Sequence, residues 1–332
     1  VKDFQSGLKV GSYDFVPIIR YNSRPKDPSE MSMSDALPVT ASSGWRDYYE
    51  MCKPRVVLLM LLCTLVGMFL ATTSFVEIDL IAYCLVGVAL VAGSAAALNH
   101  LIDASVDQKM ARTENRPVAQ GRVSNRQGLV FVFITGAAGL LILAVFVNPL
   151  TAWLNFFSWL GYGVIYSLYL KRATSQNIVI GGLFGAAPPL FGWTAVTNSI
   201  DGGGLLLVLI IFAWTPPHFW ALAIDRLSDY QKVDIPMLPI THGVAYTKLH
   251  IVLYTIILIV VSVLPYVTGM SNLLYLISAL ALGAGFLYWS LVLLFDKNPN
   301  AALETFKYSI VYLAALFGGL LLDHYLMPIN YA

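Results

Sequence analysis

Charged residues are scarce in this sequence. Asp, Glu, Lys and Arg make up 12% of its 332 residues, whereas hydrophobic residues make up 58%. A soluble domain carries about 25% charged residues, so half of the usual charge is missing. A soluble fold of this length has too small an interior for so much apolar surface, whereas a bilayer requires no charged exterior. The composition therefore predicts an integral membrane protein in contact with the lipid bilayer.

A large net charge, paired cysteines and a secretory leader are also missing. The net charge of +1 provides no basic surface, so no nucleic-acid partner is expected. Cys52, Cys63 and Cys84 form no CxxC pair and lie in or beside apolar segments, which predicts packing rather than a disulfide or metal framework. Residues 1–45 lack the apolar run of a signal peptide and are polar. They are expected to be disordered, before a single transmembrane domain at 46–332.

From residue 54 onward, long apolar runs alternate with short polar breaks. Each run is close to the roughly 20 residues that a helix needs to cross a bilayer. The pattern predicts an all-α bundle of about nine transmembrane helices, at 55–72, 79–102, 127–148, 150–170, 177–197, 204–224, 249–269, 273–295 and 305–326. The least distinct boundary is Asn148-Pro149, where proline favours the start of a new helix.

Nine spans place the connecting loops alternately on two sides of the membrane. All 20 Lys and Arg residues then fall on the side of the N-terminus. The positive-inside rule makes the N-terminal region and these loops cytoplasmic and puts the C-terminus outside, on the periplasmic side of a cell inner membrane. An error in one early span would mix the charges of the two sides, so the separation supports the predicted number.

Two groups of carboxylates stand at the cytoplasmic ends of predicted spans. Asn99, Asp103 and Asp107 are spaced by four residues, so one helical face carries all three. Asp225 and Asp229 have the same spacing after the sixth span. Carboxylates near hydrocarbon, with like charges one turn apart at a helix C-terminus, are unfavourable on three counts. This cost calls for a compensating cation.

Hard oxygen ligands favour Mg²⁺, which typically binds one or two carboxylates together with substrate phosphates. We expect all five residues of the two groups to hold Mg²⁺ and a diphosphate, with Asp103, Asp107 and Asp229 as the catalytic carboxylates. The candidate diphosphate-binding residues are Lys109, Arg112, Arg116, Lys171, Arg172 and Lys232. The alternative is that the aspartates are solvated or pair with nearby Lys and Arg.

Aromatic side chains in the spans are candidates to stabilise an allylic carbocation by cation–π contact. They are Tyr162, Tyr166, Tyr169, Trp193, Trp214, Phe219 and Trp220. Most aromatic residues in membrane helices serve in packing or at the membrane interface, so the sequence does not separate the two roles.

The two aspartate motifs resemble those of the UbiA superfamily of intramembrane prenyltransferases. Longer strings, over roughly residues 50–330, resemble its protoheme IX farnesyltransferase branch. These strings are Lys53-Pro54-Arg55, Met110-Ala111-Arg112-Thr113, Arg116-Pro117, Asn177-Ile178-Val179-Ile180-Gly181-Gly182, Ala187-Pro188-Pro189-Leu190, Trp214-Thr215-Pro216-Pro217-His218-Phe219-Trp220 and Ile235-Pro236-Met237-Leu238-Pro239. The resemblance implies a helical bundle around a central cavity, and it points to Asp229 more strongly than to Asp225.

The resemblance also implies a reaction. A farnesyl group passes from farnesyl diphosphate to the 2-vinyl group of haem B, water adds, and haem O and diphosphate are formed. Mg²⁺ is then the cofactor, haem B is a substrate, and a haem A synthase or an oxidase-assembly protein is a candidate partner. His218 and His100 become candidates to bind haem, whereas a lone membrane histidine is otherwise a packing residue near the interface.

Two other functions remain open on the sequence. A prenyltransferase of quinone synthesis, from the same superfamily, would carry similar aspartates, but the Pro-Pro-His-Phe-Trp and Ile-Pro-Met-Leu-Pro strings argue against it. A cation-coupled transporter would also use intramembrane carboxylates. Transporter sites usually lie near the bilayer midplane, whereas these carboxylates cluster at one face.

Overall fold

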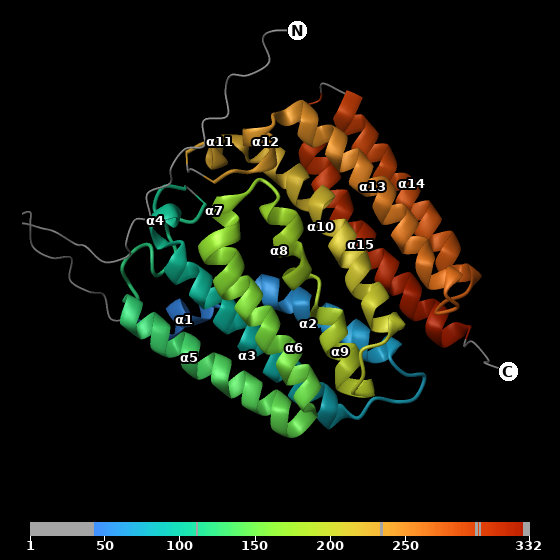
Figure 1. The fold of residues 1–332 in the computed structure, drawn as a ribbon, viewed down its shortest axis with the longest axis horizontal. Helices are drawn as coiled ribbons and strands as arrows, with labels where there is room; N and C mark the ends of the chain where they lie inside the picture. Colours follow the sequence, from blue (N-terminus) through green and yellow to red (C-terminus); the bar gives the residue numbers. More distant parts are fainter. Residues whose placement is uncertain (1–42, 111, 233–234, 296–297, 299, 328–332) are drawn as a thin grey trace, which may run out of the picture. The chain divides into compact units, whose positions relative to one another are not determined.

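The computed structural model describes residues 43–110, 112–232, 235–295, 298 and 300–327, and this part of the chain is built from helices without strands (Figure 1). Of residues 1–45, which are predicted to be disordered, only residues 43–45 are among the described residues. The last of these, Trp45, begins a helix rather than ending a disordered segment.

The long helices begin and end close to the predicted boundaries. They are α2 (Pro54–Leu70), α3 (Ile78–Ile102), α5 (Asn125–Ile142) with the π-helix η3 (Leu143–Val147), α6 (Pro149–Trp159) with the π-helix η4 (Leu160–Leu170), α8 (Asn177–Gly185), α9 (Pro188–Thr197), α10 (Gly202–Asp225), α13 (Val244–Val267), α14 (Leu273–Phe295) and α15 (Ala301–Leu326). The short helices are α1 (Trp45–Met51), α4 (Ala104–Asp107), α7 (Lys171–Ala173), α11 (Leu227–Tyr230) and α12 (Leu238–Thr241).

The predicted count of nine spans is not reached. Seven helical segments of the described chain are long and apolar enough to cross a membrane, with α8 and α9 together forming one of them. An eighth is added if α1 and α2, which meet at an angle of 54°, count as one broken span. The predicted span at 150–170 is helical as α6 and η4 but is not among these segments. Its Asn, Ser, Trp and Tyr side chains make it less apolar than its neighbours.

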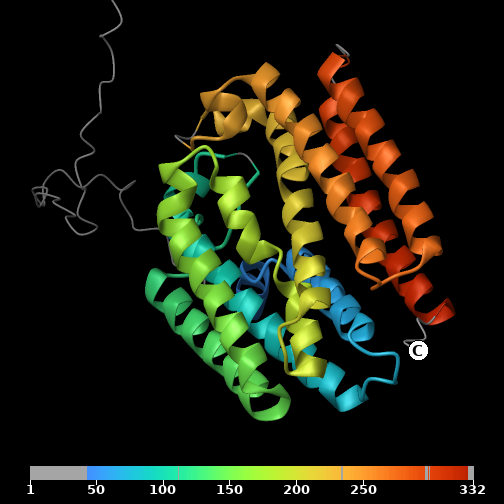
Figure 2. The same ribbon diagram turned by 45° about the vertical axis from the view of Figure 1, so that its right-hand side comes forward.

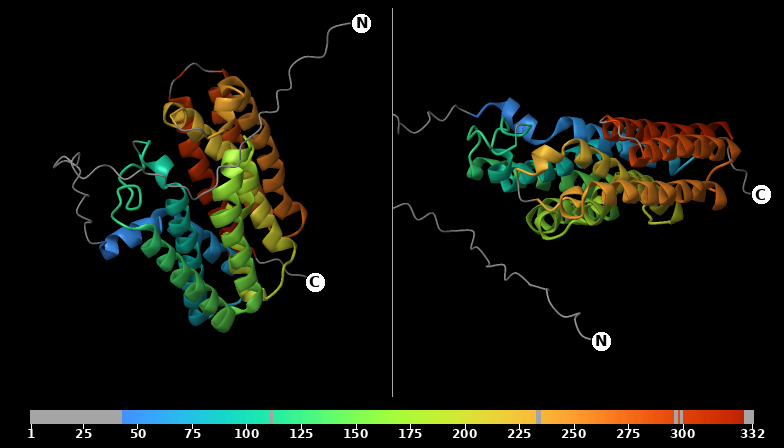
Figure 3. Two further views of the ribbon diagram at one scale, coloured as in Figure 1. Left: turned by 60° about the vertical axis from the view of Figure 1, so that its left-hand side comes forward. Right: turned by 90° about the horizontal axis from the view of Figure 1, so that it is seen from above.

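Four buried apolar clusters hold the described helices together, and two of them include residues of α2. The larger one joins α2, α10, α13, α14 and α15 through large side chains that include Trp214, Tyr275 and Tyr312. The other joins α2, α3, η3 and α9, with Met68 and Leu143 fully buried. Figure 3 shows α14 and α15 side by side along their length, in agreement with their contacts. Apolar side chains on the outer faces of α5, α13 and α14 remain exposed, as expected of helices that face lipid.

The polar connections gather the short helices at one end of the bundle. Figures 1 and 2 show α4 and α7 at the end where α11 and α12 lie. The first of these connections follows α3, the second follows η4 and the third follows α10, which are the positions of both aspartate motifs and of Lys171-Arg172. The fold therefore brings to one end the groups that the sequence spreads over more than a hundred residues.

Candidate active site

The first aspartate motif lies where α3 breaks. α3 ends at Ile102, and Asp103 connects it to the short helix α4, of which Asp107 is the last residue. Helical hydrogen bonding continues through the break, because Asp103 N donates to Asn99 O at 3.0 Å and Asp107 N donates to Asp103 O at 2.8 Å. The three side chains thus stay one turn apart, as the spacing predicts. All three residues are buried, with at most 5% of each exposed.

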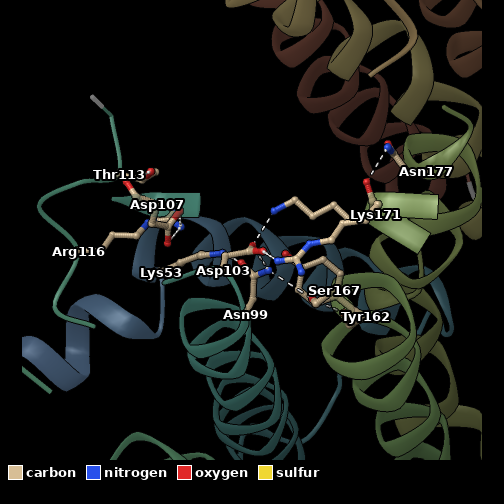
Figure 4. A network of polar contacts seen from close by, with 11 residues as sticks. Lys53, Asn99, Asp103, Asp107, Thr113, Arg116, Tyr162, Ser167, Lys171 and Asn177 are labelled. Carbon is tan, nitrogen blue, oxygen red and sulfur yellow. Dashed lines mark hydrogen bonds and ion pairs between the residues drawn. The ribbon is translucent and has the colours of Figure 1, made fainter. Parts of the chain in front are cut away.

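Asp103 is the centre of a polar network (Figure 4). Its Oδ2 accepts hydrogen bonds from Lys171 Nζ at 2.6 Å and from Asn99 Nδ2 at 2.8 Å. Its Oδ1 is enclosed and has no hydrogen-bond partner among the described residues. Arg172 Nη2 lies 3.9 Å from Oδ1. One oxygen of Asp103 is therefore fully used and the other is free to bind a ligand.

Lys53 extends this network from the start of α2, a role that the sequence did not predict. Its Nζ donates to Asn99 Oδ1 at 2.5 Å. Lys53 has a left-handed backbone (φ 50°, ψ 61°), in the bend between α1 and α2. A non-glycine residue in this region stores about 1–3 kcal/mol of strain, which the surrounding structure must compensate. The signals in the sequence are Pro54, which begins α2 and thereby places Lys53 at its N-terminus, and the Lys53-Pro54-Arg55 string of the family resemblance.

The π-helix η4 supplies the other side of the network. Ser167 lies within it and receives a 3.3 Å hydrogen bond from Asn99 Nδ2. Ser167 Oγ in turn donates to Tyr162 O, five residues earlier, at 2.9 Å. π-Helical turns are rare and occur frequently at functional sites. Their wide turns were not predicted, because no residue pattern in 150–170 distinguishes them from an α-helix.

Asp107 has its own basic partner. Arg116 Nη1 lies 2.8 Å from Oδ1 and 2.7 Å from Oδ2 of Asp107 (Figure 4). Thr113 Oγ1 donates to Asp107 O at 3.2 Å, which fixes the loop that carries Arg116. Lys171 and Arg116 thus supply the positive charge that the buried carboxylates require. The alternative of pairing with nearby Lys and Arg therefore applies to both aspartates of the first motif.

The second motif is more open. Asp225 ends α10 and Asp229 lies in α11, and their side chains are 20% and 22% exposed. Asp225 Oδ2 lies 3.2 Å from Arg226 Nε, and Asp229 Oδ1 lies 3.6 Å from Lys232 Nζ. Exposed pairs of this kind stabilise a fold by at most about 1 kcal/mol, so they compete weakly with a ligand.

Apolar contacts connect the two motifs. Val106 and Met110, beside Asp107, belong to the same cluster as Ile224 and Tyr230, beside Asp225 and Asp229. Tyr166 of η4 lies within electrostatic range of both Asp103 and Tyr230. Even so, no three His, Cys, Asp or Glu side chains within the described ranges converge on one point as a preformed metal cluster. Substrate phosphates would have to complete any metal site.

The remaining basic candidates are less engaged. Lys109 and Arg112 are exposed and form no ion pair with another described residue. Arg172 is 47% exposed and contacts Asp103 only at long range. Lys232 is exposed beside Asp229. Of the six predicted diphosphate-binding residues, the structure therefore places Arg116 and Lys171 directly on the aspartates of the first motif.

The two histidine candidates have different surroundings. His100 is 2% exposed, and neither ring nitrogen has a hydrogen-bond partner among the described residues. His218 is 8% exposed, and its Nδ1 lies 2.6 Å from Ser309 Oγ. Its ring stacks between Trp214, at a centroid distance of 4.1 Å, and Phe306, at 4.6 Å.

The structure separates the aromatic candidates by position. Tyr162 and Tyr166 stack on each other at 5.5 Å and lie within electrostatic range of Asp103. Tyr169 is 68% exposed. Trp193 binds Asp201 through Nε1 at 3.0 Å, beyond the N-terminus of α10 and at the opposite end from Asp225. Tyr162 and Tyr166 thus lie near the first motif, whereas Trp193 lies near the other end of α10.

The predicted packing role of the cysteines agrees with the structure. All three are free, Cys63 and Cys84 are buried, and Cys52 is partly exposed. None lies in the polar network of Figure 4.

Comparison with proteins of known sequence gives several close relatives. The chain is 60% identical over 303 residues to a protoheme IX farnesyltransferase of Teredinibacter turnerae, which covers 91% of this chain and 96% of the relative. It is 60% identical over 288 residues to the enzyme of the same name from Saccharophagus degradans, with 87% and 95% covered.

Solved structures share the fold at low sequence identity. A digeranylgeranylglyceryl phosphate synthase superposes with a TM-score of 0.72 at 17% identity, covering 85% of this chain and 99% of that one. A UbiA homologue from Archaeoglobus fulgidus, bound to GPP and Mg²⁺, has a TM-score of 0.61 at 16% identity and covers 82% and 99%. The model of the UbiA prenyltransferase family matches residues 60–316. The chain belongs to the UbiA prenyltransferase family.

Proposed function

We propose that this protein transfers a farnesyl group from farnesyl diphosphate to the 2-vinyl group of haem B, with water addition and release of diphosphate, to form haem O. The observation that carries the proposal is the 60% identity, over most of the chain, to enzymes named protoheme IX farnesyltransferase. The buried Asn99–Asp103–Asp107 set at one end of the bundle supplies the polar site that a diphosphate needs in a membrane. Quinone-pathway acceptors and ion transport have no comparable support.

Mg²⁺ fits the first motif. Asp103 Oδ1 is an enclosed carboxylate oxygen that has no hydrogen-bond partner among the described residues. Such an oxygen is a suitable ligand for a hard cation. Asn99, Asp103 and Asp107 would hold the metal from α3 and α4, and Asp225 and Asp229 would do so from α10 and α11. The bound metal would neutralise charge on the leaving diphosphate. In support, the Archaeoglobus fulgidus homologue was solved with GPP and Mg²⁺.

The basic side chains of the chain itself bind the diphosphate. Lys171 pairs with Asp103, and Arg116 pairs with Asp107. Lys171 and Arg116 would offer their charge to phosphate oxygens beside these two carboxylates, which would hold the metal. Lys53 and Arg172 lie at the edge of the same network and add positive charge. The leaving group thus meets preorganised charge in a site that excludes water.

The aromatic and histidine residues serve the organic substrates. Tyr162 and Tyr166, stacked beside Asp103, present π-faces where an allylic cation would form. His218 is proposed to orient haem through its iron, because imidazole is a common haem ligand. His100, with two unpartnered nitrogens, is a second candidate to contact a substrate. A haem A synthase or an oxidase-assembly protein is the proposed recipient of the product.

The chain is a multi-pass membrane protein. We infer a cell inner membrane as its location, with the N-terminus and the aspartate motifs cytoplasmic, and with residues 46–332 as one domain. Support comes from the absence of Lys and Arg in the described connections at 71–77, 198–201 and 268–272. A reporter fused after Ala332 is expected to be active outside the cytoplasm, and activity in the cytoplasm alone would contradict this orientation.

The function is tested by mass spectrometry of extractable haems. Expression of the full chain in cells that contain haem B but make no haem O is expected to produce a haem heavier by one farnesyl group and one hydroxyl group. A matched culture expressing Asp103→Asn controls for farnesylation by the host. Absence of the product from cells in which the wild-type protein is inserted in the membrane would exclude haem B as the acceptor.

A further inference from the structure

Two residues of α10 hold a single residue of α15. Trp214 Nε1 donates to Ser309 O at 2.7 Å, and His218 Nδ1 lies 2.6 Å from Ser309 Oγ. Trp214 and His218 are one helical turn apart, and their rings are nearly parallel, with an angle of 21° between the planes. Ser309 is completely buried, so water does not compete for these hydrogen bonds.

The direction of each hydrogen bond follows from the donors available. Ser309 Oγ donates its only proton to Phe306 O at 2.6 Å, since a carbonyl oxygen can only accept. Ser309 Oγ therefore has only lone pairs to offer His218, and His218 Nδ1 must be the donor. In a neutral imidazole, the other nitrogen then carries the lone pair. The network thus assigns the proton to Nδ1 and the lone pair to Nε2.

The His218 ring is also fixed in direction. It is held between Trp214 and Phe306, and the edge of Phe219 packs on it at a centroid distance of 4.9 Å. Nε2 has no hydrogen-bond partner among the described residues, yet it is not enclosed as the two nitrogens of His100 are. Nε2 is therefore the polar atom of this ring without a partner among the described residues, and its lone pair points in a fixed direction.

We propose that Ser309 is a positioning residue, which acts through His218 to present the Nε2 lone pair to the iron of the haem substrate. This inference rests on the proposed function. Imidazole nitrogen suits iron, and proteins commonly fix such a ligand through a hydrogen bond from its other ring nitrogen. Ser309 is 91 residues from His218 and touches no proposed metal or diphosphate ligand. Ser309 thus affects the binding of haem and not the binding of farnesyl diphosphate.

The test is haem titration of the purified full-length protein, followed by the Soret spectrum, with binding of farnesyl diphosphate measured in parallel. The variants are Ser309→Ala and His218→Ala. The control is Ser290→Ala, which removes a buried hydroxyl that binds Thr255 at 3.0 Å on other helices. Ser309→Ala is expected to weaken haem binding about 10-fold to 100-fold and to shift the Soret band. Ser290→Ala is expected to leave both unchanged, and farnesyl diphosphate binding should stay constant in all three variants.

Each outcome bears on a different claim. If Ser309→Ala matches the wild type while His218→Ala weakens haem binding, the positioning role of Ser309 is overturned. If His218→Ala leaves the affinity and the spectrum unchanged, His218 is not the iron ligand and the proposal is also overturned. Failure of the wild-type protein to bind haem or to form haem O counts against the proposed function itself. If Ser309→Ala does not fold, Ser309→Cys replaces it with the same expected direction, because sulfur is a weak acceptor.

Discussion

Asp103→Asn and Asp107→Asn are each expected to lower farnesyl transfer about 100-fold to 1,000-fold, while the protein still inserts in the membrane. Each substitution removes one negative charge from the proposed cation site but keeps the size of the side chain. Asp103 loses its attraction for Lys171, and Asp107 loses that for Arg116. The measurement is the rate of haem O formation by purified protein at saturating Mg²⁺ and substrates.

Asp47→Asn is a matched control for these variants. Asp47 is also a buried carboxylate, paired with Arg122, but it lies in α1 and outside the two motifs. Arg122 is 37% exposed, so the loss of this pair is expected to cost only about 1 kcal/mol, and stability must be compared as well. Asp47→Asn is expected to retain its activity at a temperature where it is folded. Retention of haem O formation in both motif variants would rule out the metal assignment.

Gly192→Ala and Gly67→Ala are expected to have the largest effect on stability. α2 and α9 approach so closely that a Cβ on Gly192 would lie 1.8 Å from Thr64 O, and one on Gly67 would lie 2.0 Å from Pro189 O. Both obstacles are backbone atoms, which cannot rotate away. Small residues let helix backbones approach in this way in membranes. Forcing the pair apart is expected to cost about 3 kcal/mol.

The effect is measured as the melting temperature in detergent, together with the fraction of protein that elutes as a single species. Gly318→Ala, inside α15, is the control because a Cβ there meets no atom within 4 Å. It is expected to be neutral or to stabilise the fold by about 0.4–1 kcal/mol, since alanine restricts the unfolded chain. Equal melting temperatures for Gly192→Ala and Gly318→Ala would show that α2 and α9 separate at little cost.

Periodicity and composition predicted the long helices, because both report on local properties of the chain. Apolar runs gave boundaries within a few residues for segments such as α14, predicted at 273–295 and observed at Leu273–Phe295. The predicted number of nine spans is not confirmed. Length and alternation do not separate a helix that is merely long, such as α6 with η4, from one that is also strongly apolar. The bend at Lys53 and the helix α1 were missed as well, since a left-handed residue leaves no apolar pattern.

The sequence by itself determined that this protein lies in a membrane and that aspartates spaced by four residues share a helical face. Its short sequence strings also resemble those of the protoheme IX farnesyltransferase branch. Only the tertiary structure decided which cation meets which carboxylate. Lys53 reaches Asn99 over 46 residues, Lys171 reaches Asp103 over 68, and His218 meets Ser309 over 91. Such pairs depend on how the helices pack, and no local spacing encodes them. The aspartate motif requires positive charge, and the packing of the helices places Lys171 and Arg116 where they provide it.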